Sequence, residues 1–422
     1  MKIASHLRHA DTGHSSAQCH VVPSEADCLA KMYILVTDVT YPVCEASMNF
    51  YISEEQVMLR EQARALLAEC SAPNRLRRLI EQGAEWDEPL WREFGNLGFL
   101  GAAIPEAHGG LGLAALDLGV ISEALGSANA ALPFFSSIVL AAEAIRLGGS
   151  EEQHARWLPR LASGDVIATF AYAEGPAGFS AEAIRSTLAG GALSGTKTPV
   201  ADGGIAQLAV VLARTASTPT LALVELDRPG VSRTRLESFD QLRAHYTLSF
   251  DGAAAEPLEA GGDIIDQLFD GAAVQAAFEA VGGAEACLYM ARDYALERRI
   301  FGRPLAGYQA IKHKLADILV AVELARSSAH FAAWTASHDP GALPVAAAGA
   351  RLTAADAFER AARENLQVHG GIGYTWEANC HFYYRRERTL ALGLAGREHW
   401  ADRLIAHLAS NGAQPVPRRE TA

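Results

Sequence analysis

The feature that most constrains this chain is a change in its hydrophobic period, from helical to strand-like and back again. Apolar residues recur at three- and four-residue intervals up to about residue 164, alternate or run in short stretches over 165–262, and return to the helical interval up to about residue 410. We therefore predict a mainly α-helical fold with a central β unit. At 422 residues the chain is also too long for one ordinary core.

Local signals mark where several elements begin. Ser53 with Gln56, and Ser150 with Gln153, have the spacing of capping boxes, in which two side chains bond the free N–H groups of a helix start. Further helices are expected over 86–97, 117–125, 132–147, 271–299, 308–337, 343–369 and 399–410. The expected strands are 166–172, 207–213, 220–225 and 245–250.

The two ends of the chain lack both periods. We expect residues 1–47 to be a disordered extension, or Met48 to be the true start, and residues 411–422 to be a tail. The six cysteines contain no CxxC pair, so we expect reduced thiols in a cytoplasmic protein. Histidines and cysteines, which can bind soft metals, are concentrated in residues 1–47, but their spacings are irregular, so we expect no metal site. A net charge of -13 argues against a nucleic-acid partner, and no apolar run is long enough for a membrane span.

Three segments carry the strongest local signal. Residues 98–113 read GFLGAAIPEAHGGLGL, residues 298–305 read RRIFGRPL and are followed by KLAD at 314–317, and residues 367–377 read QVHGGIGYTWE. In this order and at these spacings they resemble three motifs of the acyl-CoA dehydrogenase family. The resemblance covers nearly everything after Met48.

The resemblance implies an N-terminal helical domain over 48–164, a middle β-barrel domain over 165–262 and a C-terminal four-helix bundle over 263–410. It also implies FAD as cofactor, an acyl-CoA as substrate, an electron-transfer flavoprotein as electron acceptor, and a homodimer or homotetramer. In the family, several FAD contacts reach a neighbouring subunit. The matching FAD-binding positions are Arg298, Phe301, Gln309, Gln367, His369, Gly370, Gly371 and Ala173.

Each of these positions also has a simpler interpretation. The Arg298 guanidinium suits a pyrophosphate, but an arginine at a helix C-terminus also interacts favourably with the helix dipole. Gly370 and Gly371 let a dinucleotide approach the backbone, and the same pair is typical of a helix C-cap. Outside the motif, Phe301 would be interpreted as a core residue and Gln309 as a surface residue.

The catalytic base of the family is absent from its two usual places. In the family a glutamate follows the glycine motif or lies early in the first bundle helix. Here Leu394 or Ala395 holds the first place and Ala272 the second. Glu398, and after it Asp270, are the nearest substitute carboxylates, although the sequence favours an ordinary solvated helix charge for both.

The flavin-ring contacts depart from the family pattern as well. Where the family has Ala-x-Thr-Glu-Pro-x-x-Gly-Ser, residues 171–179 read AYAEGPAGF, so Ala173 replaces a hydroxyl donor. Where the family has Lys-x-Trp-Ile-Thr-Asn, residues 197–202 read KTPVAD, so Pro199 and Ala201 replace an aromatic ring and a second hydroxyl. Each lost hydrogen bond is worth about 1 kcal/mol, and backbone amides of the same strands could still hold the ring.

Three functions are compatible with these departures. The favoured one is an FAD-dependent acyl-CoA dehydrogenase with a displaced base, which desaturates an acyl-CoA at the α,β position and passes electrons to an electron-transfer flavoprotein. The second is a non-catalytic subunit that shares an FAD site in a heteromer with another chain of the family. The third is a flavin monooxygenase or oxidase on the same fold.

Overall fold

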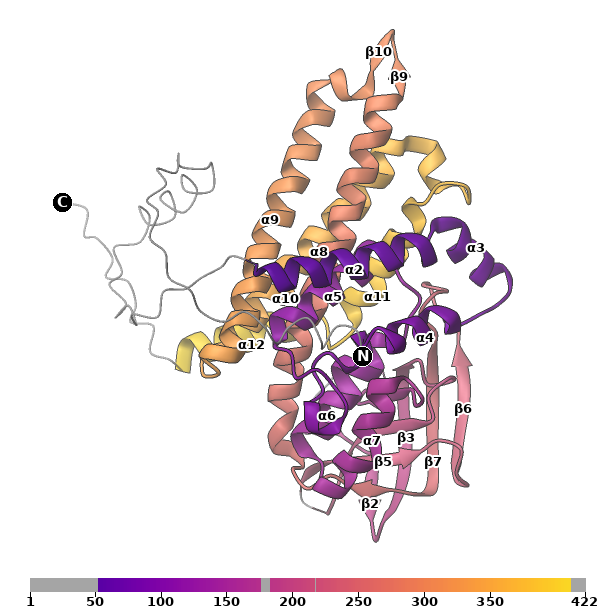
Figure 1. Ribbon diagram of the computed structural model, residues 1–422, viewed down its shortest axis with the longest axis vertical. Coiled ribbons are helices and arrows are strands. Elements are labelled where there is room, and N and C mark those ends of the chain that lie inside the picture. The colour runs from indigo at the N-terminus through magenta and orange to yellow at the C-terminus, as the bar shows by residue number, and fades with distance from the viewer. Residues whose placement is uncertain (1–51, 176–182, 217, 411–422) are drawn as a thin grey trace, which may run out of the picture. The chain divides into compact units, whose positions relative to one another are not determined.

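The structure is a computed structural model that describes residues 52–175, 183–216 and 218–410. The expectations for residues 1–47 and 411–422 lie outside the described residues. The first described part is helical (Figure 1), with α2 (Glu54–Cys70), α3 (Pro73–Glu81), α4 (Glu88–Asn96), α5 (Ala115–Ser127), a π-helix (Phe135–Ala142), α6 (Glu143–Gly148) and α7 (Glu151–Ser163).

Both predicted capping boxes are confirmed. The Ser53 hydroxyl accepts a hydrogen bond from the Gln56 N–H at 3.2 Å, and the Gln56 side-chain oxygen accepts one from the Ser53 N–H at 3.0 Å. Ser150 and Gln153 make the same pair of bonds at 3.2 and 2.9 Å. These bonds satisfy N–H groups that have no partner within the helix, which is why α2 and α7 begin where they do.

The predicted β unit between two helical parts is confirmed. Its strands are β1 (Ala168–Ala171), β2 (Thr187–Ala189), β3 (Ala192–Ala201), β4 (Leu208–Arg214), β5 (Pro219–Glu225), β6 (Val231–Leu236), β7 (His245–Ala254) and β8 (Glu256–Pro257). They form one sheet in the open order β6-β7-β3-β2-β4-β5-β8, with β1 parallel to β4. The predicted strands became β1, β4, β5 and β7, while β2, β3, β6 and β8 were missed.

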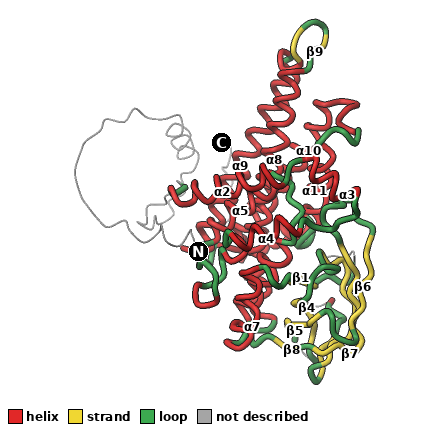
Figure 2. Tube along the Cα trace, turned by 45° about the vertical axis from the view of Figure 1, so that its right-hand side comes forward, coloured by secondary structure: helices red, strands yellow, loops and turns green. Residues whose placement is uncertain are grey.

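The C-terminal helices are α8 (Ile265–Glu297), α9 (Gln309–His338), α10 (Leu343–His369), α11 (Cys380–Leu392) and α12 (Arg397–Ser410). Figure 2 shows the strands gathered at one end of the described fold and the link between α8 and α9 at the opposite end. Of these helices α11 was not predicted. No helix among the described residues is long and apolar enough to cross a membrane.

Close packing of α5 on α8 depends on glycines. A Cβ on Gly126 would come within 1.9 Å of the Glu279 carbonyl oxygen, and a Cβ on Gly282 within 1.9 Å of the Glu123 carbonyl oxygen. The two helix backbones therefore touch where neither residue has a side chain. This contact places α8 closely against α5 of the N-terminal helices.

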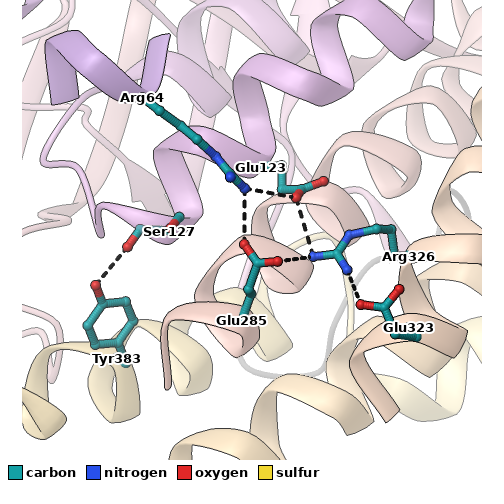
Figure 3. A network of polar contacts seen from close by, with 7 residues as sticks. All are labelled: Arg64, Glu123, Ser127, Glu285, Glu323, Arg326 and Tyr383. Carbon is teal, nitrogen blue, oxygen red and sulfur yellow. Dashed lines mark hydrogen bonds and ion pairs between the residues drawn. The ribbon is translucent and has the colours of Figure 1, made fainter. Parts of the chain in front are cut away.

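A network of ion pairs joins four helices (Figure 3). Arg326 of α9 lies 2.6 Å from Glu285 of α8, and Arg64 of α2 lies 3.0 Å from the same carboxylate. Both arginines also lie 3.5 Å from Glu123 of α5, which is buried. Burial raises the pKa of Glu123, and Arg326 opposes that rise. The arginines thus compensate carboxylates that would be costly to bury unpaired.

Candidate active site and cofactor contacts

A cavity of about 320 Å³ lies between the sheet, the π-helix, α8 and the residues that follow α11. Apolar side chains make up much of its wall, among them Phe135, Leu140, Phe170, Ala276 and Leu394. The residues of the altered flavin-ring motif, Pro199 and Ala201, also line it. A mostly apolar cavity with a few polar groups is the usual form of a small-molecule site.

The loop that follows α11 is held in place by three side chains. Arg351 of α10 donates hydrogen bonds to the carbonyl oxygens of Leu390 and, at 3.1 Å, of Gly393. The Tyr172 hydroxyl accepts a hydrogen bond from the Leu394 N–H at 2.9 Å, and the Trp400 indole N–H donates to the Leu394 carbonyl at 2.8 Å. Leu394 is thereby fixed on the cavity wall.

The two family positions for the base are apolar in the structure. Leu394 lines the cavity, whereas Ala395 is buried behind it and does not. In α8, Ala276 lines the cavity one turn after Ala272, and both are buried alanines. Leucine and alanine side chains cannot accept a proton, so neither of the two family positions offers a general base in this chain.

The two predicted substitute carboxylates lie away from the cavity. Asp270 is buried and forms a bidentate ion pair with Arg403. The Arg403 Nε lies 3.0 Å from Asp270 Oδ1, and the Arg403 Nη2 lies 2.8 Å from Asp270 Oδ2. Burial raises the pKa of Asp270, and Arg403 opposes that rise. Glu398 is exposed in the first turn of α12. Neither Asp270 nor Glu398 lines the cavity, so the structure places neither predicted base at the cavity wall.

Sequence reasoning missed a buried carboxylate that does line the cavity. Asp202, 5% exposed, ends the altered motif at the position where the family has asparagine. Its Oδ2 lies 2.5 Å from the Ser136 hydroxyl, which also lies 3.2 Å from the Pro133 carbonyl oxygen. Burial raises the pKa of Asp202 to about 6, opposed first by the hydrogen bond from Ser136. The replacement of asparagine by aspartate was the signal that could have identified it.

The hydroxyl of Ser136 explains how Asp202 can hold a proton. A hydroxyl has one hydrogen, so Ser136 can donate either to Asp202 or to Pro133, but not to both. When Asp202 is protonated, its carboxyl O–H can donate to the Ser136 hydroxyl oxygen. The Ser136 hydroxyl can then donate to the Pro133 carbonyl oxygen, so all three groups are hydrogen-bonded. The geometry therefore accommodates the neutral acid as well as the carboxylate.

Backbone groups next to Ala173 are already paired with each other. The Thr198 N–H donates to the Ala173 carbonyl at 2.8 Å, and the Gly175 N–H donates to the Thr198 carbonyl at 2.8 Å. Lys197, fully buried, forms an ion pair with Glu174 at 2.7 Å. These amides are therefore not free to replace the missing hydroxyl donors in a flavin contact.

A second group of predicted residues lies at the link between α8 and α9, opposite the sheet (Figures 1 and 2). Arg298 follows α8, Phe301 lies between the short strands β9 (Arg299–Ile300) and β10 (Arg303–Pro304), and Gln309 opens α9. All three residues are exposed. The Phe301 side chain is 95% exposed, so the interpretation of Phe301 as a core residue is wrong. Among described residues the Arg298 guanidinium has no hydrogen-bond or ion-pair partner.

The glycine motif lies at the same end of the molecule. His369 stacks on Tyr294 of α8 with ring centroids 4.2 Å apart, one turn before Arg298. Gly370 is the C-cap of α10 with φ 65°, which confirms the simpler interpretation of that glycine. A Cβ on Gly370 or Gly371 would meet no atom within 4 Å, so the backbone is open to a ligand. Gln367 is exposed on the last turn of α10.

Comparison with known proteins agrees with this geometry. Residues 53–165 match the profile of the acyl-CoA dehydrogenase N-terminal domain, and residues 259–406 match that of the C-terminal domain. The chain is 30% identical to acyl-CoA dehydrogenase FadE27 of Mycobacterium tuberculosis, over 87% of this chain and 100% of that protein. It therefore belongs to the acyl-CoA dehydrogenase family, whose members are oxidoreductases that act on acyl-CoA.

Two solved structures have the same fold. The ChsE4-ChsE5 complex from Mycobacterium tuberculosis matches with a TM-score of 0.80 and 30% identity, over 87% of this chain and 100% of that one. Butyryl-CoA dehydrogenase from Megasphaera elsdenii matches with a TM-score of 0.80 and 25% identity, over 86% and 100%. The first of these is a complex of two differently named chains.

Family membership indicates FAD as the cofactor, and the residues present fit a dinucleotide. Gly370 and Gly371 leave their backbone open, and Arg298 presents an unpaired guanidinium among the described residues, as a pyrophosphate requires. Phe301 presents an exposed ring beside them. The fit to the flavin ring is weaker at the cavity, because Ala173 and Ala201 replace the hydroxyl donors of the family pattern.

Proposed function

We propose that this chain serves in the α,β-desaturation of an acyl-CoA thioester, with electrons passed on to an electron-transfer flavoprotein. In this reaction a base removes the α proton, and FAD, when bound, accepts the β hydride. The apolar cavity lined by Phe135, Leu140 and Leu394 is suited to an acyl group. Arg298, Phe301, Gly370 and the other residues of the α8–α9 end would bind the dinucleotide.

We further infer that the base comes from a second chain of the family. The observation that carries this inference is the apolar character of both places where the family has a glutamate: Leu394, which lines the cavity, and Ala272, which is buried in α8 one turn before the cavity-lining Ala276. The residues expected to contact the dinucleotide at the other end are exposed, and the backbone of Gly370 and Gly371 is open to a ligand, so they suit FAD held between two chains. The similarity to the ChsE4-ChsE5 complex supports such an assembly.

In this assembly the residues of the chain have distinct tasks. Arg351, Tyr172 and Trp400 fix the loop that carries Leu394, and so close one wall of the cavity against water. Arg298 neutralises phosphate charge. An apolar wall favours binding of an acyl group but leaves proton removal to another carboxylate.

A second candidate is a dehydrogenase that is complete in itself and uses Asp202 as the base. The observation in its favour is the cavity position of Asp202, with a pKa of about 6. A carboxylate with a pKa close to the working pH is well matched to proton transfer. In this case the second chain would not be needed for flavin reduction.

An anaerobic titration distinguishes the two candidates. The chain is purified alone and together with co-expressed glutamate-bearing family members, and acyl-CoAs of different length and bulk are added while flavin absorbance is followed. Bleaching only in the two-chain assembly supports the first proposal. Bleaching of the chain alone, abolished by Asp202→Asn, supports the second.

Two other results would contradict both proposals. Preparations without flavin, alone or with any partner, would remove the chain from this reaction. Rapid reoxidation of the reduced flavin by air, with hydroxylation of the substrate, would instead identify the monooxygenase or oxidase that the sequence left open.

A further inference from the structure

Three potential metal ligands meet where the turn at residues 105–113 packs on α7. His108 ends a short 3-10 helix in that turn, and Glu151 and His154 lie three residues apart in the first turn of α7. One ligand atom from each of the three lies within 4.8 Å of the others. The two imidazole rings have centroids 5.5 Å apart. The cluster is separate from the cavity and from the dinucleotide contacts at the α8–α9 end.

The ring of His154 is held in the orientation that a metal ligand needs. Its Nε2 lies 2.9 Å from the carbonyl oxygen of Ile145, and a carbonyl oxygen only accepts hydrogen bonds. Nε2 therefore carries a hydrogen, and in the neutral ring Nδ1 has a free lone pair. Metal-binding histidines are commonly fixed by such a bond from the other ring nitrogen to a backbone carbonyl.

The surroundings of His154 leave room for this bond. A Cβ on Gly149 would come within 2.6 Å of the Ile145 carbonyl oxygen and 3.1 Å of His154 Nε2. Glycine at this position therefore lets the ring reach the carbonyl. The His154 side chain is only 15% exposed, so packing restricts its rotation.

The ligand atoms, which lie within 4.8 Å of one another, would have to move closer together to bind a small divalent ion. His154 Nδ1 lies 3.8 Å from Glu151 Oε1, and ligand atoms of a tetrahedral zinc ion lie about 3.4 Å apart. The Glu151 side chain is 94% exposed and can rotate freely. Two imidazoles and a carboxylate fill three positions of a tetrahedron and leave the fourth for water.

We propose that His108, Glu151 and His154 bind an imidazole-preferring divalent metal ion such as Zn²⁺. The ion would connect the turn at residues 105–113 to the start of α7. The proposal does not depend on the reaction assigned above, because none of its residues lines the cavity. The competing interpretation is a simple ion pair between Glu151 and protonated His154.

The test uses the full chain, stripped of metal with a chelator and titrated with ZnCl₂ against a chromophoric chelator. Wild type is compared with His108→Ala, His154→Ala and Glu151→Gln. His338→Ala is the matched control, because His338 is an exposed histidine whose Nδ1 lies 2.9 Å from the Trp334 carbonyl oxygen on α9. Thermal unfolding with and without zinc is recorded for each protein.

We expect wild type and His338→Ala to bind one more zinc equivalent than either His108→Ala or His154→Ala. Glu151→Gln should weaken this equivalent by roughly tenfold or more, because a charged ligand is lost. Zinc should raise the melting temperature of wild type and not of the histidine variants. If all proteins bind the same number of equivalents with the same shift in melting temperature, the cluster is an ion pair only. His108→Ala alone decides the matter if His154→Ala does not fold.

Discussion

The α8–α9 end of the molecule and the cavity beside the sheet differ in how closely they match the family. At the α8–α9 end Arg298, Phe301 and Gly370, the residues proposed to contact FAD, are open to solvent or to another chain. In the cavity, Leu394 and Ala201 stand where the family has a base and a hydroxyl donor. Cofactor binding and proton chemistry are thus separate demands, and this chain meets the first more completely than the second.

The largest expected effect comes from restoring a carboxylate to the cavity. Leu394→Glu would place one on the wall, where the loop is already held by Arg351 and Tyr172. A positioned base contributes roughly 10²–10⁴-fold. We therefore expect the rate of flavin reduction by acyl-CoA, measured by anaerobic stopped flow, to rise by that order. Leu394→Gln is the control of equal size without a base. Equal rates in both variants would show that the cavity lacks more than the carboxylate.

The second effect concerns the buried acid of the cavity. The pKa of Asp202 is raised from 3.8 to about 6, so the folded state holds this proton more tightly than the unfolded state does. The stability from this group is complete below pH 3.8 and is lost as the pH rises through 6. A shift of about 2 units corresponds to about 3 kcal/mol. Asp202→Asn should therefore gain about 3 kcal/mol over wild type at pH 8, and little at pH 4.

Urea unfolding of wild type and Asp202→Asn at both pH values measures this difference. Other titrating groups are common to the two proteins and cancel. If the stability difference between wild type and Asp202→Asn is the same at pH 4 and pH 8, Asp202 is ionised at both pH values. That result would argue against Asp202 as the base. It would also sharpen the contrast between the cavity and the α8–α9 end.

The third effect tests the α8–α9 end. Arg298→Ala removes a guanidinium that has no partner among the described residues and should contact phosphate. A hydrogen bond to a charged group is worth roughly 1.5–3 kcal/mol, so FAD affinity should fall by about 10- to 100-fold. Arg299→Ala is the matched control, because Arg299 is the adjacent exposed arginine in β9. Equal loss of flavin from both variants, followed by fluorescence of the released cofactor, would refute a specific role for Arg298.

Much of the fold followed from the sequence because helical periodicity is a strong signal. The prediction for residues 343–369 coincides with α10, and the short buried strands β4 and β5 were recognised from apolar runs. The missed strands have weak local signals. β3 contains Gly195 and Pro199, and β6 is a largely exposed edge strand of the sequence VSRTRL. Pairing with β7 defines both, and pairing is not local information.

The candidate site was harder to predict than the fold. Motif spacing predicts Arg298 and Gly370 as FAD contacts, but it could not show that Asp270 is held by Arg403 or that Glu398 lies outside the cavity wall. Those facts depend on helix orientation. Asp202 was passed over because a single change from asparagine to aspartate has chemical meaning only once its burial is known.

The smallest effect concerns the backbone of the loop beside the cavity. Ala395 has φ 68°, a left-handed conformation that costs a residue with a Cβ about 1 kcal/mol and glycine almost nothing. Ala395→Gly should therefore stabilise the protein by up to about 1 kcal/mol, despite the greater freedom of glycine in the unfolded chain. The same change at Ala355, inside α10, should destabilise it by about 1 kcal/mol. Opposite signs in urea unfolding would show that the folded loop holds residue 395 in this left-handed conformation. Equal signs would mean that the loop relaxes, and that the backbone beside Leu394 is not fixed by its hydrogen bonds.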